Sequence, residues 1–452
     1  MKKYPAYKEF TDIWLDKLPK DWLTERMKWL FIETSIKGVQ GPQLVASQHN
    51  GVILKKHYEA RTVEALKGTE GFKYVRQGNF VISLRSFQGG IEIAHATGII
   101  SPAYTILELK SDLLNQEYFK YLAKSAVFIK LLQMSVTGIR EGQNVNYSAL
   151  KQHLIPIPTL SEQQQIVRYL DWKTSQINHL IHGYERLISL LEERKKAVIN
   201  EAVTKGIRKD VAMKDSGVEW LGEVPVNWEI NRAKWMFSES KERRHDDDEM
   251  ATASQKYGII LQKDFMEKEQ RRIVMADQNT EAWKHVEPND FVISLRSFQG
   301  GLEMSKITGC VTWHYIVLKA RKDIYPEYYK WLFKSQGYIH ALQRTSDFIR
   351  DGQDLRYTNF EKVPLPYLPL DEQKEIAEYI TQKLNRIEFV LATTQKEIDL
   401  LRERRTRLIS DVVTGALDVR DVVVPEYVQE QDMEVTEDGD EYEGERAVET
   451  NC

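Results

Sequence analysis

The chain has 452 residues, of which 42% are hydrophobic and 29% are charged. This composition is that of a soluble globular protein and excludes wholesale disorder, and the length predicts two or three domains of about 100–200 residues each. The first residues, MKKYPAYKEF, lack the apolar run of a signal peptide, and no stretch approaches the roughly 18 apolar residues of a membrane span. We therefore expect a cytoplasmic protein. Its two cysteines, Cys310 and Cys452, exclude a disulfide framework and a cysteine-based zinc site.

The formal net charge of −4 conceals an uneven distribution. Residues 425–452 hold eleven acidic side chains against Arg446 alone, which leaves 62 basic and 56 acidic residues in the rest of the chain. A modestly positive body is compatible with nucleic-acid binding but does not establish it. High charge and low hydrophobicity predict a disordered acidic tail over residues 419–452.

An internal repeat dominates the sequence. NFVISLRSFQGG at residues 79–90 returns as DFVISLRSFQGG at 290–301, with eleven of twelve positions identical. IREGQ at 139–143 returns as IRDGQ at 349–353, and SEQQQI at 161–166 returns as DEQKEI at 371–376. The chain therefore contains one module used twice.

Each copy of the module is predicted to hold a mixed region followed by a long helix. Short β-type runs such as FVISL and YTILEL alternate with glycines and precede a helical stretch, YFKYLAKSAVFIKLLQ, which predicts an α+β domain. We expect the mixed regions at residues 1–160 and 207–370, and the helices at 161–206 and 371–418.

The two helices carry matching apolar stripes at spacings of three and four residues, which are typical of a coiled-coil seam. The stripe residues are Ile177, Ile181, Tyr184, Ile188, Leu191 and Val198 in the first helix and Ile387, Leu391, Thr394, Ile398, Leu401 and Leu408 in the second. An apolar stripe needs a partner surface, and we expect the helices to pair antiparallel as a spacer with pseudo-two-fold symmetry. The alternative is that each helix packs on its own domain.

The sequence lacks the common catalytic and metal-binding motifs. The sequence has no Gly-Lys dipeptide for a phosphate-binding loop, no G-x-G-x-x-G fingerprint and no Asn/Asp-Pro-Pro-aromatic motif of an adenine methyltransferase. His179 and His182 lie one helical turn apart without a further ligand. The run from His245 to Asp248 is interpreted as a solvated charged insertion. We therefore expect no catalytic residue and no metal in this chain.

Five motifs give the sequence a family resemblance, and the order of such motifs is repeated in the two copies. They are SGVEWLGEVPVNWE (216–229), GIISPAY (98–104), IPIPTLSEQQQIVRYLD (155–171), LLEERKKAVINEAVTKG (190–206) and LLRERRTRLISDVVTGALD (400–418). With two variable regions, each followed by a helix, the chain resembles the specificity subunit of type I restriction-modification systems. One departure is GCVTWHY at 309–315, where the first copy has GIISPAY.

The resemblance implies two tandem target-recognition domains in a non-catalytic, DNA-binding subunit. It also implies two copies of a DNA adenine methyltransferase subunit and a motor and endonuclease subunit as partners. S-adenosylmethionine, ATP and Mg²⁺ would be bound by those partners, and no membrane would be involved.

Arginine suits guanine edges and phosphates, glutamine suits adenine, and lysine suits phosphates. Such side chains are candidates for DNA contacts, with the motif serines, where they lie beside glycines or in the segments that diverge between the copies. In the first copy they are Lys55, Lys56, Arg61, Arg85, Ser86, Gln88, Arg140 and Gln143. In the second they are Arg243, Arg244, Lys256, Arg271, Arg272, Arg296, Ser297, Gln299, Arg350 and Gln353. The SLRSFQGG motif is the same in both copies, so it is equally well explained as a structural turn. Discrimination between half-sites is expected from the divergent segments 35–76 and 240–286.

Two other functions remain open at this point. The chain could be a self-contained DNA methyltransferase or nuclease, or a scaffold that binds proteins and not DNA.

Overall fold

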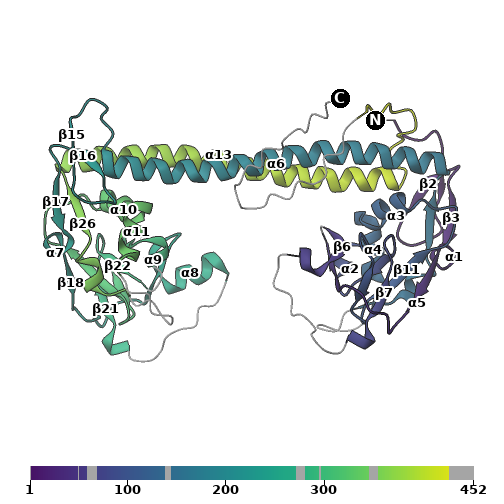
Figure 1. The fold of residues 1–452 in the computed structure, drawn as a ribbon, viewed down its shortest axis with the longest axis horizontal. Coiled ribbons are helices and arrows are strands. Elements are labelled where there is room, and N and C mark those ends of the chain that lie inside the picture. The colour runs from purple at the N-terminus through teal and green to yellow at the C-terminus, as the bar shows by residue number, and fades with distance from the viewer. Residues whose placement is uncertain are drawn as a thin grey trace, which may run out of the picture. The chain divides into compact units, whose positions relative to one another are not determined.

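The computed structural model describes residues 2–48, 50–58, 69–137, 144–270, 280–294, 297–345 and 355–426 (Figure 1). The chain divides into two compact units. Unit 1 comprises Met1–Tyr184 with Lys396–Cys452, and unit 2 comprises Glu185–Gln395. Each unit thus contains one copy of the mixed region and one half of each long helix.

A four-stranded antiparallel sheet forms the middle of each unit. In unit 1 its strand order is β4 (Phe31–Thr34), β11 (Thr105–Leu109), β8 (Phe80–Ile82) and β9 (Glu92–Ile93). In unit 2 the order is β18 (Phe237–Ser240), β25 (Ile316–Ala320), β22 (Phe291–Ile293) and β23 (Glu303–Met304). Successive side chains of a strand face opposite sides. Phe80 and Ile82 accordingly join one core and Val81 another, so both faces of the sheet are covered.

Short hairpins and strand pairs cover the smaller core of each unit. In unit 1 they are β5 (Leu44–Ser47) with β6 (Gly51–Leu54), and β7 (Lys73–Val75) with β10 (Gly98–Ile100). In unit 2 they are β19 (Ala251–Ser254) with β20 (Gly258–Leu261), and β21 (Lys284–Val286) with β24 (Gly309–Val311). Leu44, Val52 and Val75 close this core against the sheet in unit 1.

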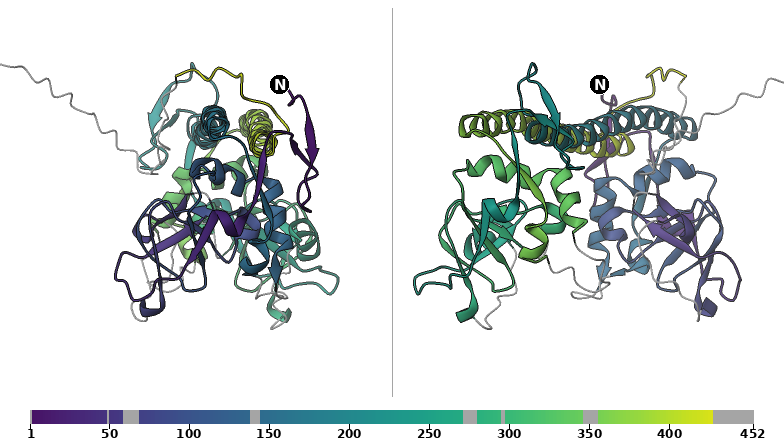
Figure 2. Two further views of the ribbon diagram at one scale, coloured as in Figure 1. Left: turned by 90° about the vertical axis from the view of Figure 1, so that its right-hand side faces the viewer. Right: turned by 60° about the vertical axis from the view of Figure 1, so that its left-hand side comes forward.

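Two short helices cover the other face of each sheet and lie between it and the long helices (Figures 1 and 2). They are α3 (Gln116–Ala123) and α4 (Ala126–Met134) in unit 1, and α10 (Pro326–Lys334) and α11 (Gln336–Gln343) in unit 2. The sequence predicted one helical stretch over residues 118–133. The stretch is broken at Ser125 because its hydroxyl accepts the backbone N–H of Phe128 and caps a new helix.

The remaining elements repeat between the units in the same way. Unit 1 also has β1 (Tyr7–Glu9), β2 (Lys17–Pro19), β3 (Leu23–Arg26), α1 (Met27–Leu30), α2 (Ser86–Gly89), β12 (Val136–Thr137), β13 (Asn144–Val145), α5 (Tyr147–Leu150) and β14 (Leu154–Ile157). Unit 2 also has β15 (Met213–Asp215), β16 (Glu223–Pro225), β17 (Glu229–Arg232), α7 (Ala233–Met236), α8 (Gln262–Glu269), α9 (Ser297–Gly300), α12 (Tyr357–Phe360) and β26 (Pro364–Tyr367).

Two long helices, α6 (Leu160–Lys205) and α13 (Leu370–Val413), run antiparallel in both units. In unit 1 the Arg405 guanidinium donates to the Asn178 side chain over 2.6 Å, and in unit 2 the Lys195 ammonium lies 2.7 Å from a Glu388 carboxylate oxygen. The predicted α+β fold with an antiparallel helix pair is confirmed. The second helix ends at Val413 and not at 418, because Gly415 adopts φ +74° and turns the chain.

All twelve residues of the predicted stripes lie on the less exposed sides of the helices. Ile177, Ile181, Val198, Thr394 and Ile398 are buried. The half-buried members are Tyr184, Ile188, Leu191, Ile387, Leu391, Leu401 and Leu408. The predicted stripes are therefore the sides of the two helices that are shielded from solvent.

The first residues of the predicted acidic tail are packed on unit 1. Val419 is buried, and the Gln165 amide donates to the carbonyl oxygens of Val419 and Val422 over 3.0 and 2.7 Å. The expectation of disorder from residue 419 is therefore wrong for residues 419–424, because Val419, Val422 and Val424 pack on the unit 1 core. Residues 427–452 lie outside the described residues. Among the helices described, none is both long and apolar enough to cross a membrane.

Candidate nucleic-acid interface

The SLRSFQGG motif forms a strand end followed by a single helical turn in each unit. In unit 1 it runs from the end of β8 into α2, and the side chains of Arg85 and Gln88 are exposed. In unit 2 the equivalent Gln299 is exposed on α9. These three side chains are placed where an external ligand could reach them, and their contact with DNA stays a prediction.

The motif serines have a different placement. Ser86 is buried, and its hydroxyl accepts the backbone N–H of Ser83 over 2.8 Å. Ser297 is also buried and accepts the N–H of Ser294 at the same distance. Buried hydroxyls have no surface to offer DNA, so these two serines hold the turn together and do not make the predicted contact in this structure.

Close packing explains the first glycine of the motif in both copies. A Cβ atom on Gly89 would come within 2.6 Å of the Gln48 side chain, and one on Gly300 within 2.2 Å of Gln255. Gln48 and Gln255 follow the first strands of the equivalent hairpins β5–β6 and β19–β20. The motif thus supports the tip of a hairpin in each unit, which accounts for its near identity without a role in base recognition.

The second glycine allows an even closer approach. Gly90 has φ +86°, which side chains rarely adopt, and a Cβ there would lie 2.4 Å from the Ala123 carbonyl oxygen. Gly301 has φ +77°, and a Cβ there would come even closer to the Phe333 carbonyl oxygen near the end of α10. In both units, therefore, the motif is seated directly on the end of a short helix.

An ion pair between a half-buried lysine and a buried glutamate lies beneath this junction in each unit. The Lys124 ammonium donates to the carbonyl oxygens of Gln48 and Gly89, each over 3.1 Å, and to the Glu92 carboxylate. Lys334 and Glu303 form the equivalent pair in unit 2. Burial raises the pKa of the Glu92 carboxyl, and the adjacent Lys124 charge opposes that rise. The ion pair fixes the hairpin tip relative to the motif.

The basic candidates of the divergent segments differ in their surroundings. Lys56 and Arg243 are exposed, while Arg244 is half-buried. Lys55 is half-buried, and its ammonium lies 3.4 Å from the Gln43 side-chain oxygen. Lys256 is exposed but paired with Glu269 over 3.0 Å. The other candidates, Arg61, Arg140, Gln143, Arg271, Arg272, Arg296, Arg350 and Gln353, lie outside the described residues.

One half-buried side chain near this edge was not predicted. Tyr104 follows β10 in unit 1, and the Arg85 charge opposes the rise that burial causes in its pKa, so the two residues are neighbours. The matching loop of unit 2 carries Trp313, which is half exposed and stacks on His314 at 3.4 Å between ring centroids. In the sequence, the one sign of this tryptophan is that GCVTWHY differs from GIISPAY of the first copy. Cys310 of that segment is buried, which raises the pKa of its thiol to about 11.

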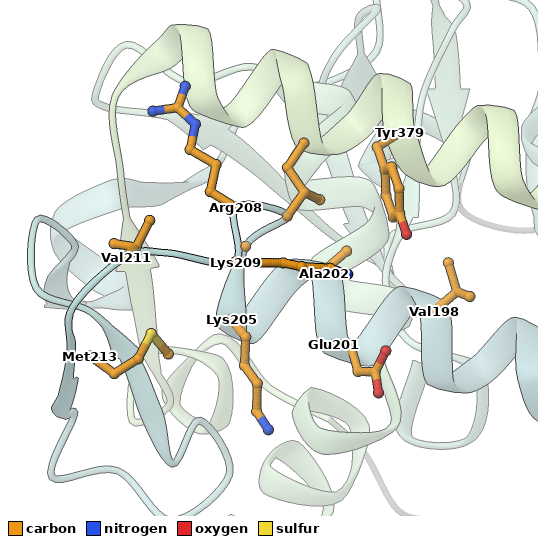
Figure 3. A pocket seen from close by; sticks show the side chains of 11 residues that line it. Val198, Glu201, Ala202, Lys205, Arg208, Lys209, Val211, Met213 and Tyr379 are labelled. Atoms are coloured by element: carbon orange, nitrogen blue, oxygen red, sulfur yellow. The ribbon is translucent and has the colours of Figure 1, made fainter.

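A pocket of about 330 Å³ lies in unit 2, where α6 ends and the chain turns toward β15. Figure 3 shows that Val198 and Lys205 come from the last turns of α6, that Met213 comes from the segment after this helix, and that α13 contributes Tyr379. The Arg208 guanidinium is held by Glu375 over 2.8 Å. The lining combines apolar and basic side chains with a single carboxylate, Glu201, which is not the paired acid–base arrangement of a hydrolytic or transfer site.

Comparisons with known proteins agree with the repeat and the motifs. Residues 39–186 match the family model of the type I restriction modification DNA specificity domain. The chain is 22% identical over 331 residues to the protein named for the MjaX type I restriction enzyme specificity subunit of Methanocaldococcus jannaschii, covering 70% of this chain and 68% of that protein. It is also 22% identical over 454 residues to the type I restriction enzyme MjaVIII specificity subunit of the same organism, covering 90% and 95%.

A solved structure supports the fold. A chain of a type I R-M system, solved to explain complex assembly and conformational transition, matches with a TM-score of 0.60 at 16% identity, covering 89% of this chain and 100% of that one. The structural match and the sequence matches therefore agree. Over most of its length the chain is similar to the specificity subunits of type I restriction-modification systems, which are non-catalytic, and its residues 39–186 match their DNA specificity domain.

Proposed function

We propose that the chain recognises a bipartite, asymmetric DNA sequence and that each unit reads one half-site. The observation that carries the proposal is the repeated junction of a hairpin tip with the SLRSFQGG motif, at Gln48 and Gly89 in unit 1 and at Gln255 and Gly300 in unit 2. A repeated scaffold with different flanking segments suits two readers with different sequences.

Sequence discrimination is assigned to the segments that differ between the units. Lys56 and Arg243 are exposed there, and Arg85 and Gln88 of the repeated motif are exposed in unit 1. Phosphate contacts from lysine and arginine would position the duplex, and base edges would be read by side chains of the divergent loops.

The proposal includes partner subunits that supply the chemistry. Two copies of a DNA adenine methyltransferase would bind S-adenosylmethionine, and a motor and endonuclease subunit would use ATP and Mg²⁺. A duplicated chain offers two equivalent docking surfaces, and an exposed tryptophan occurs at the same position of both units. Trp29 of α1 is 58% exposed and Trp235 of α7 is 55% exposed.

Mapping of methylated adenines in the genome, with and without this gene, tests the proposal. We expect methylation of one bipartite motif to disappear when the gene is deleted. Unchanged methylation would contradict it. Methyl transfer from S-adenosylmethionine to DNA by the purified chain alone would instead support a self-contained enzyme, and the lack of any salt-dependent DNA binding by the complete complex would support a protein scaffold.

A further inference from the structure

We propose that unit 2 binds one divalent transition-metal ion of the Zn²⁺ class, through His245, His285, Glu242 and Glu287. These residues come from the segment after β18 and from β21 with the residue that follows it. The sequence alone favoured a solvated charged insertion at residues 245–248, because nothing in it showed that His285 lies alongside.

His285 is oriented as a metal-binding histidine. Its ring is buried, and Nδ1 lies 2.8 Å from a carboxylate oxygen of Asp248, whose side chain is only 2% exposed. A carboxylate that accepts the Nδ1 proton fixes the tautomer in which Nε2 carries the free lone pair. Nε2 faces the remaining ligands, since a Glu287 carboxylate oxygen, Oε1, lies 3.8 Å from it.

His245 and Glu242 complete the cluster. The His245 ring stacks on the His285 ring at 4.0 Å between centroids, and its Nε2 lies 3.1 Å from Glu242 Oε1. Ligand atoms of Glu242, His245 and His285 all lie within 4.8 Å of one another. The backbone holds this arrangement, because the N–H of His285 donates to the carbonyl oxygen of Glu242 over 3.1 Å.

Each of the two glutamates places one carboxylate oxygen near a histidine and the other near a lysine. Oε2 of Glu242 lies 3.3 Å from the Lys319 ammonium, and Oε2 of Glu287 lies 2.5 Å from it. The Oε1 atoms of both carboxylates face the imidazoles. Lys319 therefore balances part of the negative charge and leaves one oxygen of each carboxylate for an ion.

The ligand chemistry selects the kind of ion. Two neutral imidazoles and two carboxylate oxygens suit Zn²⁺ and its first-row neighbours, whereas Mg²⁺ and Ca²⁺ prefer all-oxygen sites. Tetrahedral ligands at about 2.0–2.1 Å from Zn²⁺ stand about 3.3 Å apart. The 3.1 Å between His245 Nε2 and Glu242 Oε1 is close to that value, and the ligand atoms of Glu242, His245 and His285 already lie within 4.8 Å of one another. To bind one ion, the His245 ring would rotate out of its stack on His285, and Glu287, whose Oε1 lies 3.8 Å from His285 Nε2, would move toward the other three ligands.

Among the residues that the structure describes, this cluster occurs in unit 2 and not in unit 1. In unit 1 the equivalent backbone bond joins Tyr74 N–H to the Ile36 carbonyl, so a tyrosine and an isoleucine replace His285 and Glu242. A bound ion would tie the segment from Glu242 to Asp248 to β21. That segment carries Arg243 and Arg244, so any effect on DNA reading rests on the proposed function, whereas metal binding itself does not.

The test uses the full chain, stripped with a chelator and titrated with Zn²⁺ by calorimetry. We expect one equivalent to bind and the melting temperature to rise with the Zn²⁺ concentration. His245→Ala should abolish this binding and still fold, because His245 is half exposed. Asp248→Asn should weaken it about 10- to 100-fold, as loss of a carboxylate behind a ligating histidine does.

His153→Ala in unit 1 is the matched control. His153 Nδ1 also pairs with a carboxylate, that of Asp12 over 2.8 Å, but no metal-ligand group among the described residues includes it. This variant should keep one equivalent of Zn²⁺. Stripped wild-type chain that binds no Zn²⁺, or unchanged binding by His245→Ala, would overturn the proposal.

Discussion

In unit 1, the hydroxyl group of Tyr118 donates a hydrogen bond over 3.0 Å to the carbonyl oxygen of Val413, 295 residues further along the chain. Unit 2 repeats the contact, because Tyr328 donates to Val203 over the same distance. Each mixed region thus closes on the end of the helix that belongs to the other repeat. Unit 1 is complete only when the second long helix has returned to it.

Removal of either hydroxyl should loosen one unit and not the other. Tyr118→Phe leaves a carbonyl oxygen near the end of α13 without its partner, and we expect a loss of about 0.5–1.5 kcal/mol in the free energy of unfolding of unit 1. Tyr328→Phe is the matched change in unit 2. Amide hydrogen exchange should accelerate only in the unit that carries the substitution, and equal acceleration in both would contradict this.

Lys124→Met should make stability depend more strongly on pH. The Glu92 side chain is buried, and without Lys124 its ionised form loses its partner, which costs about 1–3 kcal/mol at neutral pH. Since burial already raises the pKa of Glu92 above its value in the unfolded chain, this cost grows as the pH rises through that interval and shrinks in mild acid.

Denaturant unfolding of this variant at neutral and mildly acidic pH measures the effect. The double variant Lys124→Met with Glu92→Gln should recover much of the loss at neutral pH, since no buried charge remains. A deficit that is the same at both pH values would show that the ion pair is not its cause.

Two glycine substitutions should change the free energy of unfolding in opposite directions. Gly90→Ala places a side chain at φ +86° and against the Ala123 carbonyl, so we expect a loss of more than about 1 kcal/mol. Gly183 lies inside α6 with open space around it, and Gly183→Ala should stabilise the chain by about 0.5–1 kcal/mol. Denaturation midpoints test both, and a stabilising Gly90→Ala would refute the close packing of the motif.

The exposed basic residues of unit 1 should govern the salt dependence of DNA binding. If Lys56 and Arg85 each contact a phosphate, Lys56→Ala and Arg85→Ala should each lower the slope of log K against log salt by about 0.9. Lys20→Ala, exposed directly after β2, is the control and should leave the slope unchanged. Fluorescence anisotropy with the assembled complex measures the slope, and equal slopes for all three variants would remove these residues from the interface.

The repeat and the long helices were open to prediction because they depend on local patterns. The apolar spacing predicted α6 and the start of α13 to within one residue, and it identified stripe residues such as Ile181 and Ile398 that are buried. The end of α13 was placed too late, since helical spacing continues through the glycine that turns the chain. The packed valines after residue 418 were assigned to the disordered tail because of the acidic composition that follows them.

Contacts between distant segments could not be predicted from the sequence. Ser86 was a plausible DNA ligand until its burial was visible, and the packing of Gln48 on Gly89 joins a divergent segment to the repeated motif. The pairing of His285 with Asp248 likewise depends on the register between β21 and a loop 37 residues earlier. A single sequence carries no signal for such registers.

Exchange of one mixed region tests the central claim most directly. Residues 1–160 would be replaced by the first mixed region of another type I specificity subunit, and the methylated sites of the resulting complex would be mapped. If each unit reads one half-site, one half of the bipartite motif should change while the other half stays the same. A change in both halves, or in neither, would contradict the account.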